Sequence, residues 1–270
     1  MHSDICASMN LNSTTSMRVI VATSRGKELT PLHNPPHTWL RYSPGACIKD
    51  LTTSALEILE KHWYRYDICE PRFVYFVAGL PDLTTKEEWP NFQGRHQYQE
   101  VIFKGEVEDA VDSMKSTIRE AAFRVRAAGA VPVFGTIVPS QLERWNQIRL
   151  EQHKTTHLLH FHRYREMQLG LLQATIYTNR FIHEINNQHG VVTPALAKKI
   201  LFSRRSKYRF RHKLLVDGVH LAPVAVEDWL TRLPKVMDLN DEMYPPQLPL
   251  PPTMNTSEDE GEPIFEEDMY

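Results

Sequence analysis

Residues 17–26, MRVIVATSRG, join an apolar run to a polar turn. Apart from Arg18, the first six are apolar and several are β-branched, which is typical of a buried parallel strand. Thr23, Ser24 and Arg25 then follow at the carboxyl end of that strand. Ligands of open α/β sheets bind at this edge, so Ser24 is the first candidate functional residue.

Apolar runs and amphipathic segments alternate along the chain after this strand. The pattern predicts strands at 39–42, 73–78 and 131–138 and an edge strand at 190–193, and helices at about 48–62, 107–128, 158–187 and 224–233. Such alternation is typical of a parallel sheet with helices on both faces. The predicted fold is a three-layer α/β/α sandwich with a mainly parallel, five-stranded, flavodoxin-like sheet.

Composition divides the 270 residues into a folded domain and two tails. Residues 1–16 are rich in Ser, Thr and Asn and are predicted to be disordered, and 17–238 form the domain. Residues 239–270 are predicted to form a Pro-rich linker and a disordered acidic tail. The tail carries seven acids and no base: Glu258, Asp259, Glu260, Glu262, Glu266, Glu267 and Asp268.

The cellular setting is predicted from cysteine content and hydropathy. Three cysteines are too few and odd in number for a disulfide framework, which favours a reducing, intracellular compartment, cytoplasmic or nuclear. No apolar run approaches the roughly 18 residues of a membrane span, so no membrane contact is expected. Oligomeric state is left open.

Asp217-Gly218-Val219-His220 supplies the partners that Ser24 needs for nucleophilic catalysis. An Asp and a His three residues apart, with a glycine between them, fit one tight turn in which the carboxylate orients the imidazole. The other ring nitrogen then faces a serine brought in by the fold. Taken alone, Ser24 is better interpreted as the N-cap of a helix, and the pattern Asp-x-x-His occurs often by chance.

Four spaced blocks resemble those of the SGNH (GDSL-type) hydrolases, an α/β superfamily of esterases, lipases and carbohydrate deacetylases. The blocks are Thr23-Ser24, Gly45, Gly79-Leu80-Pro81-Asp82 and Asp217 with His220, and the resemblance covers roughly residues 17 to 235. It implies Ser24 as nucleophile, His220 as general base and acid, and Asp217 as orienting carboxylate, with the N–H groups of Ser24 and Gly45 as oxyanion donors. Arg25-Gly26 after the serine also resembles SGNH-type domains of animal mobile elements and some viruses.

Two departures from the family pattern bear on activity. Thr23 replaces the usual aspartate before the serine, which changes local hydrogen bonding only. Pro81 stands where the family has an asparagine that donates to the oxyanion, and proline has neither an amide side chain nor a backbone N–H. Losing one such donor costs about 10²–10³ in rate. Arg25 and Arg41 are the nearest substitute donors.

The remaining glycines, acids and histidines have simpler interpretations. Gly45 and Gly79 permit tight turns, and Asp82 caps a turn. His153, His157, His160 and His162 lack the acids or cysteines that would complete a metal site, so a solvated face is expected. Neither a metal nor another cofactor is predicted.

A basic run with interleaved aromatics precedes the Asp217 turn. Its six cations are Arg204, Arg205, Lys207, Arg209, Arg211 and Lys213. Such a run suits nucleic-acid contact, with phosphate pairing and base stacking. The simpler interpretation is a solvated loop, and another is steering of an anionic substrate towards the site.

Two functions from different classes follow. The first is a serine esterase, slowed by its oxyanion hole, that acts on a small-molecule or acyl ester. The alternative is a catalytically degenerate SGNH-type fold retained as a binding or assembly module of a mobile element or virus, with the basic run contacting nucleic acid. Pro81 favours the second, and the Asp217–His220 turn favours the first.

Overall fold

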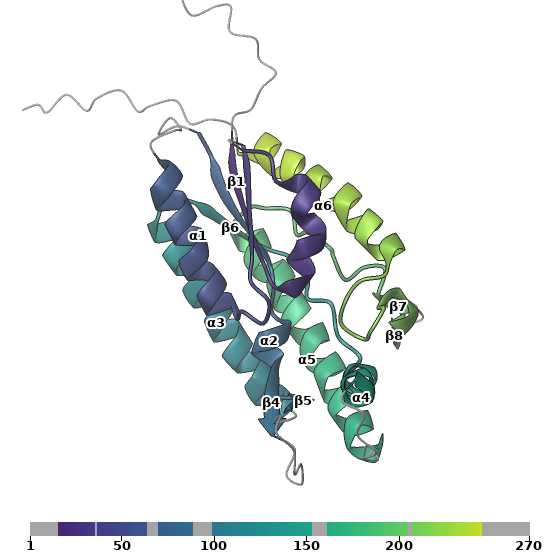
Figure 1. Ribbon diagram of the computed structural model, residues 1–270. Helices are drawn as coiled ribbons and strands as arrows, with labels where there is room; N and C mark the ends of the chain where they lie inside the picture. The colour runs from purple at the N-terminus through teal and green to yellow at the C-terminus, as the bar shows by residue number, and fades with distance from the viewer. Residues whose placement is uncertain are drawn as a thin grey trace, which may run out of the picture.

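The computed structural model describes residues 16–35, 37–63, 70–88, 99–152, 161–204 and 207–244 (Figure 1). Residues 1–15 of the predicted N-terminal tail, the Pro-rich segment from 245 and the acidic tail lie outside the described residues, whereas Ser16 is described and buried. In chain order the elements are β1 (Met17–Ala22), η1 (Ser24–Leu32), β2 (Thr38–Tyr42), α1 (Ile48–His62), β3 (Arg72–Val77), α2 (Leu80–Leu83), β4 (Thr84–Glu88), β5 (Gln99–Phe103), α3 (Val107–Ala127), β6 (Val131–Phe134), α4 (Leu142–Gln152), α5 (Phe161–Gln188), β7 (Leu201–Arg204), β8 (Lys207–Phe210), η3 (His212–Leu214) and α6 (Pro223–Met243).

The central sheet has the strand order β2-β1-β3-β6, and every pair in it is parallel. The predicted α/β fold with a parallel sheet is confirmed. The predicted number of five strands is wrong, because the described residues form four strands in this sheet. The segment 190–193, expected as the fifth, has no strand pairing.

Asparagine side chains occupy the edge where a fifth strand was expected. Asn186 on α5 accepts the backbone N–H of Phe134 at 3.0 Å and donates to its carbonyl at 2.7 Å. Two turns earlier on the same helix, Asn179 accepts the backbone N–H of Ile137 at 2.6 Å and donates to its carbonyl at 2.9 Å. A side-chain amide presents a donor and an acceptor as a neighbouring strand would, so these backbone groups are satisfied without one.

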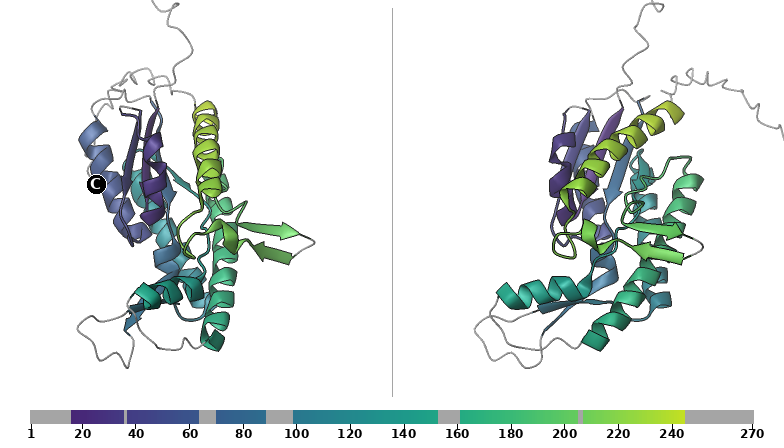
Figure 2. Two further views of the ribbon diagram at one scale, coloured as in Figure 1. Left: turned by 45° about the vertical axis from the view of Figure 1, so that its right-hand side comes forward. Right: turned by 90° about the vertical axis from the view of Figure 1, so that its right-hand side faces the viewer.

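The sheet separates two apolar layers, as strand alternation requires. Val19, Val21 and Phe76 face the layer of α1, α3 and α5, whereas Ile20 and Tyr75 face η1 and α6. In Figure 2, left, α6 lies on the opposite side of the sheet from α1. The carboxyl ends of the strands, with Ser24 at the end of β1, lie at the edge next to α2 (Figure 1).

Helix α6 continues beyond the predicted helix end and the predicted domain boundary at 238. Pro223 lies in the first turn of α6, where a backbone N–H would have no intrahelical acceptor and its absence costs no hydrogen bond. The helix continues through Pro234 and ends at Met243. Arg18 of β1 holds its last turns to the sheet through Asp238, at 2.8 Å, and the buried Asp241.

Beyond the short elements η1, α2 and η3, the sequence did not predict the antiparallel pair β4–β5, the helix α4 or the antiparallel hairpin β7–β8. The predicted strand 131–138 is also shorter, since β6 ends at Phe134. Among the described residues no helix combines the length and apolarity needed to cross a membrane.

Candidate active site

The loop from Asp217 to His220 brings the proposed acid and base into contact. His220 Nδ1 lies 2.6 Å from Asp217 Oδ2, while Asp217 Oδ1 accepts the backbone N–H groups of Val219 (2.9 Å) and His220 (2.7 Å). Burial alone would raise the pKa of Asp217, but these hydrogen bonds from His220 and Val219 outweigh it and hold that pKa below its usual value. The imidazole is 40% exposed, so a substrate can reach it.

The start of α4 supports this loop. Gly218 has φ +91° and lies so close to the chain that a Cβ would stand 2.6 Å from the carbonyl oxygen of Gln141. Gln141 N–H donates to the Gly218 carbonyl at 2.7 Å, and Arg144 donates to the Val216 carbonyl at 2.7 Å. The acid–base loop is therefore held to the start of α4 by a backbone hydrogen bond from Gln141 and by the side chain of Arg144.

Ser24 begins η1 directly after β1 and is half-buried. The next residue, Arg25, is buried and donates to the carbonyl oxygens of Val219 (2.8 Å), Val138 (2.6 Å) and Pro139 (3.4 Å). The segment carrying Ser24 is thus bonded to the segment carrying His220. Within the described ranges no hydrogen bond joins Ser24 Oγ to the His220 ring, so their approach to within about 4 Å stays a prediction.

The charge of Arg25 is set by its burial and by Asp217. Burial lowers the pKa of Arg25 to about 10, and the Asp217 carboxylate opposes that shift. The guanidinium therefore stays charged at neutral pH. Because it donates to the backbone carbonyls of three residues, Arg25 is a structural donor and not the substitute oxyanion donor that we expected.

The other expected substitute, Arg41, is also engaged elsewhere. Its Nη1 lies 2.6 Å from Glu57 Oε2 of α1, and both side chains are more than half exposed. The proposed oxyanion donor Gly45 lies in the loop after β2, with φ +77°, and a Cβ added there would meet nothing within 4 Å. An open backbone of this kind can approach a substrate closely.

The block around Pro81 starts the short helix α2. Gly79, with φ +112°, is its N-cap, and a Cβ there would lie 2.5 Å from Ile137 Cδ1. Asp82 accepts the backbone N–H of Ile48 at 3.1 Å, so it caps the first turn of α1. This bond ties the Pro81 block to the end of the Gly45 loop.

Replacing Asp82 with asparagine is expected to stabilise the protein at pH 7. Burial raises the pKa of Asp82 to about 6, against about 4 when unfolded, despite the hydrogen bond from Ile48. The folded state then holds the proton more tightly, so stability falls as pH rises from about 4 to about 6, by up to about 3 kcal/mol. Asparagine keeps an acceptor for Ile48 and removes the charge.

The measurement is the free energy of unfolding in urea at pH 4.5 and pH 7. Asp50→Asn is the matched control on the first turn of α1, since hydrogen bonds from Cys47 lower the pKa of Asp50. That control should lose stability at pH 7. Equal pH dependence in wild type and Asp82→Asn would contradict the assignment.

The basic run forms the hairpin β7–β8 and the residues that follow it. The backbone register pairs Arg204 with Lys207 and Phe202 with Arg209, and the hairpin projects from the body (Figure 2). Arg205 lies outside the described residues. The predicted nucleic-acid contact by these cations stays a prediction. Of the four histidines, 153, 157 and 160 lie outside the described residues and the side chain of His162 is not described.

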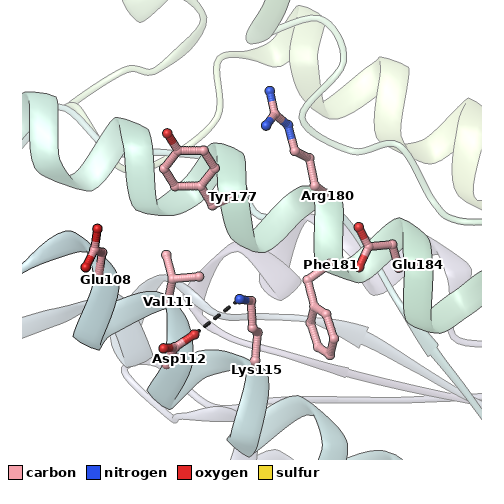
Figure 3. A pocket seen from close by; sticks show the side chains of 8 residues that line it. All are labelled: Glu108, Val111, Asp112, Lys115, Tyr177, Arg180, Phe181 and Glu184. Atoms are coloured by element: carbon pink, nitrogen blue, oxygen red, sulfur yellow. Dashed lines mark hydrogen bonds and ion pairs between the residues drawn. The ribbon is translucent and has the colours of Figure 1, made fainter.

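A cavity in the described part of the chain lies away from this site. It has a volume of about 360 Å³ and lies between α3 and α5 (Figure 3). Its lining mixes acids, cations and apolar groups: Glu108, Val111, Asp112, Lys115, Tyr177, Arg180, Phe181 and Glu184. The ion pair between Lys115 and Asp112, at 3.2 Å, belongs to this lining. The lining includes no serine, threonine or cysteine that could act as a nucleophile. We therefore place the candidate nucleophile at Ser24 and not in this cavity.

Sequence reasoning missed two contributors to the site. Trp145 of α4 meets the His220 ring edge-on, with ring centroids 5.7 Å apart. The other is Arg25, which bonds the segment that carries Ser24 to the loop that carries His220. In the sequence, Gly218 is the local indication of the contact with α4, because a glycine allows another backbone to approach the loop closely.

Comparisons with known proteins find only distant structural similarities. No protein-family model and no curated protein matches the chain. Among solved structures, a GDSL-like lipase from Bacteroides thetaiotaomicron is 12% identical with TM-score 0.48, covering 85% of this chain and 88% of that one. The lipase/acylhydrolase from Enterococcus faecalis is 11% identical with TM-score 0.45, covering 86% and 99%. Similarities at this level assign no activity to this chain.

Proposed function

We propose that the chain is a serine esterase of the SGNH type. Ser24 Oγ attacks the ester carbonyl while His220 Nε2 takes the hydroxyl proton, and Asp217 holds Nδ1–H and supports the imidazolium. The tetrahedral intermediate expels the alcohol, to which His220 returns the proton. Water then hydrolyses the acyl-enzyme by the same proton path. The N–H groups of Ser24 and Gly45 stabilise the oxyanion.

The observation that carries this proposal is the 2.6 Å contact between His220 Nδ1 and Asp217 Oδ2. It fixes the tautomer in which Nε2 accepts a proton, which is the property a general base requires. The Arg25 bond to Val219 supports it further, because it holds the Ser24 segment beside the histidine loop. A capping serine alone would not require this arrangement.

A second candidate is a binding or assembly module of a mobile element or virus. Pro81 in the first turn of α2 cannot donate to an oxyanion, and the projecting hairpin β7–β8 carries part of the basic run (Figure 2). A projecting basic β-ribbon is a shape that enters nucleic-acid grooves. In this second candidate function the Asp217–His220 pair is a structural remnant.

Labelling with a fluorophosphonate decides between the two. We expect one stoichiometric adduct on Ser24, found by peptide mass spectrometry, because the probe phosphonylates only an activated serine. Ser24→Ala should give none, and hydrolysis of short-chain aryl esters should fall to its background. Ser43→Ala, which alters an exposed serine in the loop after β2, is the matched control and should label as wild type. Absence of an adduct in folded wild-type protein would favour the binding module.

A further inference from the structure

Helix α4 places an aromatic ring and a cation beside the candidate general base. The Trp145 and His220 rings are 5.7 Å apart at 63°, edge to face. Arg149 follows Trp145 by one helical turn, and its guanidinium lies 5.8 Å from the Trp145 ring centroid. Both side chains are half-buried, so together they form a strip on one side of α4.

The position of this strip identifies which half of an ester would lie on it. In the proposed reaction His220 returns a proton to the leaving alcohol, so its ring stands next to the alcohol oxygen. A side chain that contacts the His220 ring is therefore closer to the alcohol half of the ester than to the oxyanion. Trp145 makes that contact, and Arg149 extends the strip away from the ring.

Arg149 supplies the positive charge of this strip. Glu143 and Glu151 stand two residues from Trp145 and Arg149, which places them on other sides of the helix, and Glu151 bonds Gln147 at 3.0 Å. Planar rings stack on indole and on guanidinium, and a guanidinium pairs with carboxylate or phosphate oxygens.

We propose that Trp145 and Arg149 form the alcohol subsite, and that the preferred ester carries an aromatic, negatively charged alcohol. The inference rests on the proposed function. It names the substrate class by the chemistry of the strip: a planar ring against Trp145 and an anionic group on Arg149. Neutral or aliphatic alcohols use the same site without the ionic contact.

Binding to the Ser24→Ala protein tests the subsite without turnover. The probes are 4-hydroxybenzoate and its neutral analogue 4-hydroxybenzamide, followed by the indole N–H resonance of Trp145. That signal, one of five tryptophans, is identified by its loss in Trp145→Phe. We expect the carboxylate to bind about tenfold more tightly, as a hydrogen bond to a charged group predicts. Arg149→Gln should abolish the difference, and Arg126→Gln on α3, the charge-matched control, should preserve it.

Equal binding of the two probes, or binding that leaves the Trp145 resonance unchanged, overturns the subsite. Either result leaves the fluorophosphonate adduct on Ser24 as a separate test of the esterase. In turnover, Arg149→Gln should lower kcat/KM for 4-acetoxybenzoate about tenfold relative to 4-acetoxybenzamide. An equal fall on both esters would assign Arg149 a structural role and also overturn the subsite.

Discussion

Replacing Arg25 with methionine is expected to destabilise the folded protein by roughly 3–5 kcal/mol. The guanidinium is buried and donates to the carbonyls of Val138, Pro139 and Val219. Methionine fills the space of the aliphatic stem but leaves these acceptors without a donor. Each unsatisfied buried group costs about 1–3 kcal/mol, and the stability of a whole domain is only about 5–15 kcal/mol.

Urea unfolding followed by circular dichroism measures the effect. Arg41→Met is the matched control, because its ion pair with Glu57 is exposed and such pairs contribute at most about 1 kcal/mol. Arg25→Lys keeps the charge but loses the planar set of donors, so it should fall between the two. A loss of less than about 1 kcal/mol in Arg25→Met would show that the carbonyls find other donors.

The same residue couples the two halves of the candidate site. Arg25 adjoins Ser24, and Val219 adjoins His220, although 194 positions separate Arg25 from Val219. If Arg25→Lys remains folded, we therefore expect its labelling rate at Ser24 to fall with little change in substrate binding. Geometry between nucleophile and base affects the chemical step more than affinity.

The features that sequence could predict are those with local physical causes. The run at 17–22 is apolar and β-branched and forms β1 as predicted. The Asp217 and His220 side chains meet because they are three positions apart in one tight loop. The helices 48–62 and 107–128 have apolar stripes and correspond to α1 and α3 within one residue.

The features that sequence could not predict depend on long-range partners. Residues 190–193 have strand-like composition, but Asn186 already satisfies the edge of β6, and Asn240 of α6 takes the N–H of Val192 at 2.7 Å. In sequence the hairpin β7–β8 resembles a basic loop, because its charged residues interrupt the alternation of apolar and polar residues that is typical of a strand. The contact of Trp145 with His220 joins two segments with no shared pattern.

Replacing Pro81 with asparagine is expected to raise ester turnover by about 10²–10³, the value of one oxyanion donor. Pro81 lies in the first turn of α2, where backbone N–H groups have no intrahelical acceptor. Asparagine there restores both a backbone N–H and a side-chain amide at the end of β3, beside the loop that carries Gly45. Losing the rigid proline should lower stability by only about 0.4–1 kcal/mol, because the unfolded chain gains freedom.

The gain should appear in kcat while KM changes little, because the new hydrogen bond strengthens only as charge develops on the oxyanion. Pro81→Ala restores the backbone N–H without the amide, and Pro81→Asp matches the shape of asparagine without its donor. Turnover of short-chain aryl esters by the three variants, each beside its Ser24→Ala double variant, separates these contributions. Asparagine exceeding both alanine and aspartate would assign the gain to the side-chain amide. Three rates equal to that of the wild type would mean that residue 81 does not face the oxyanion, and the match of this block to the family's donor position would then fail.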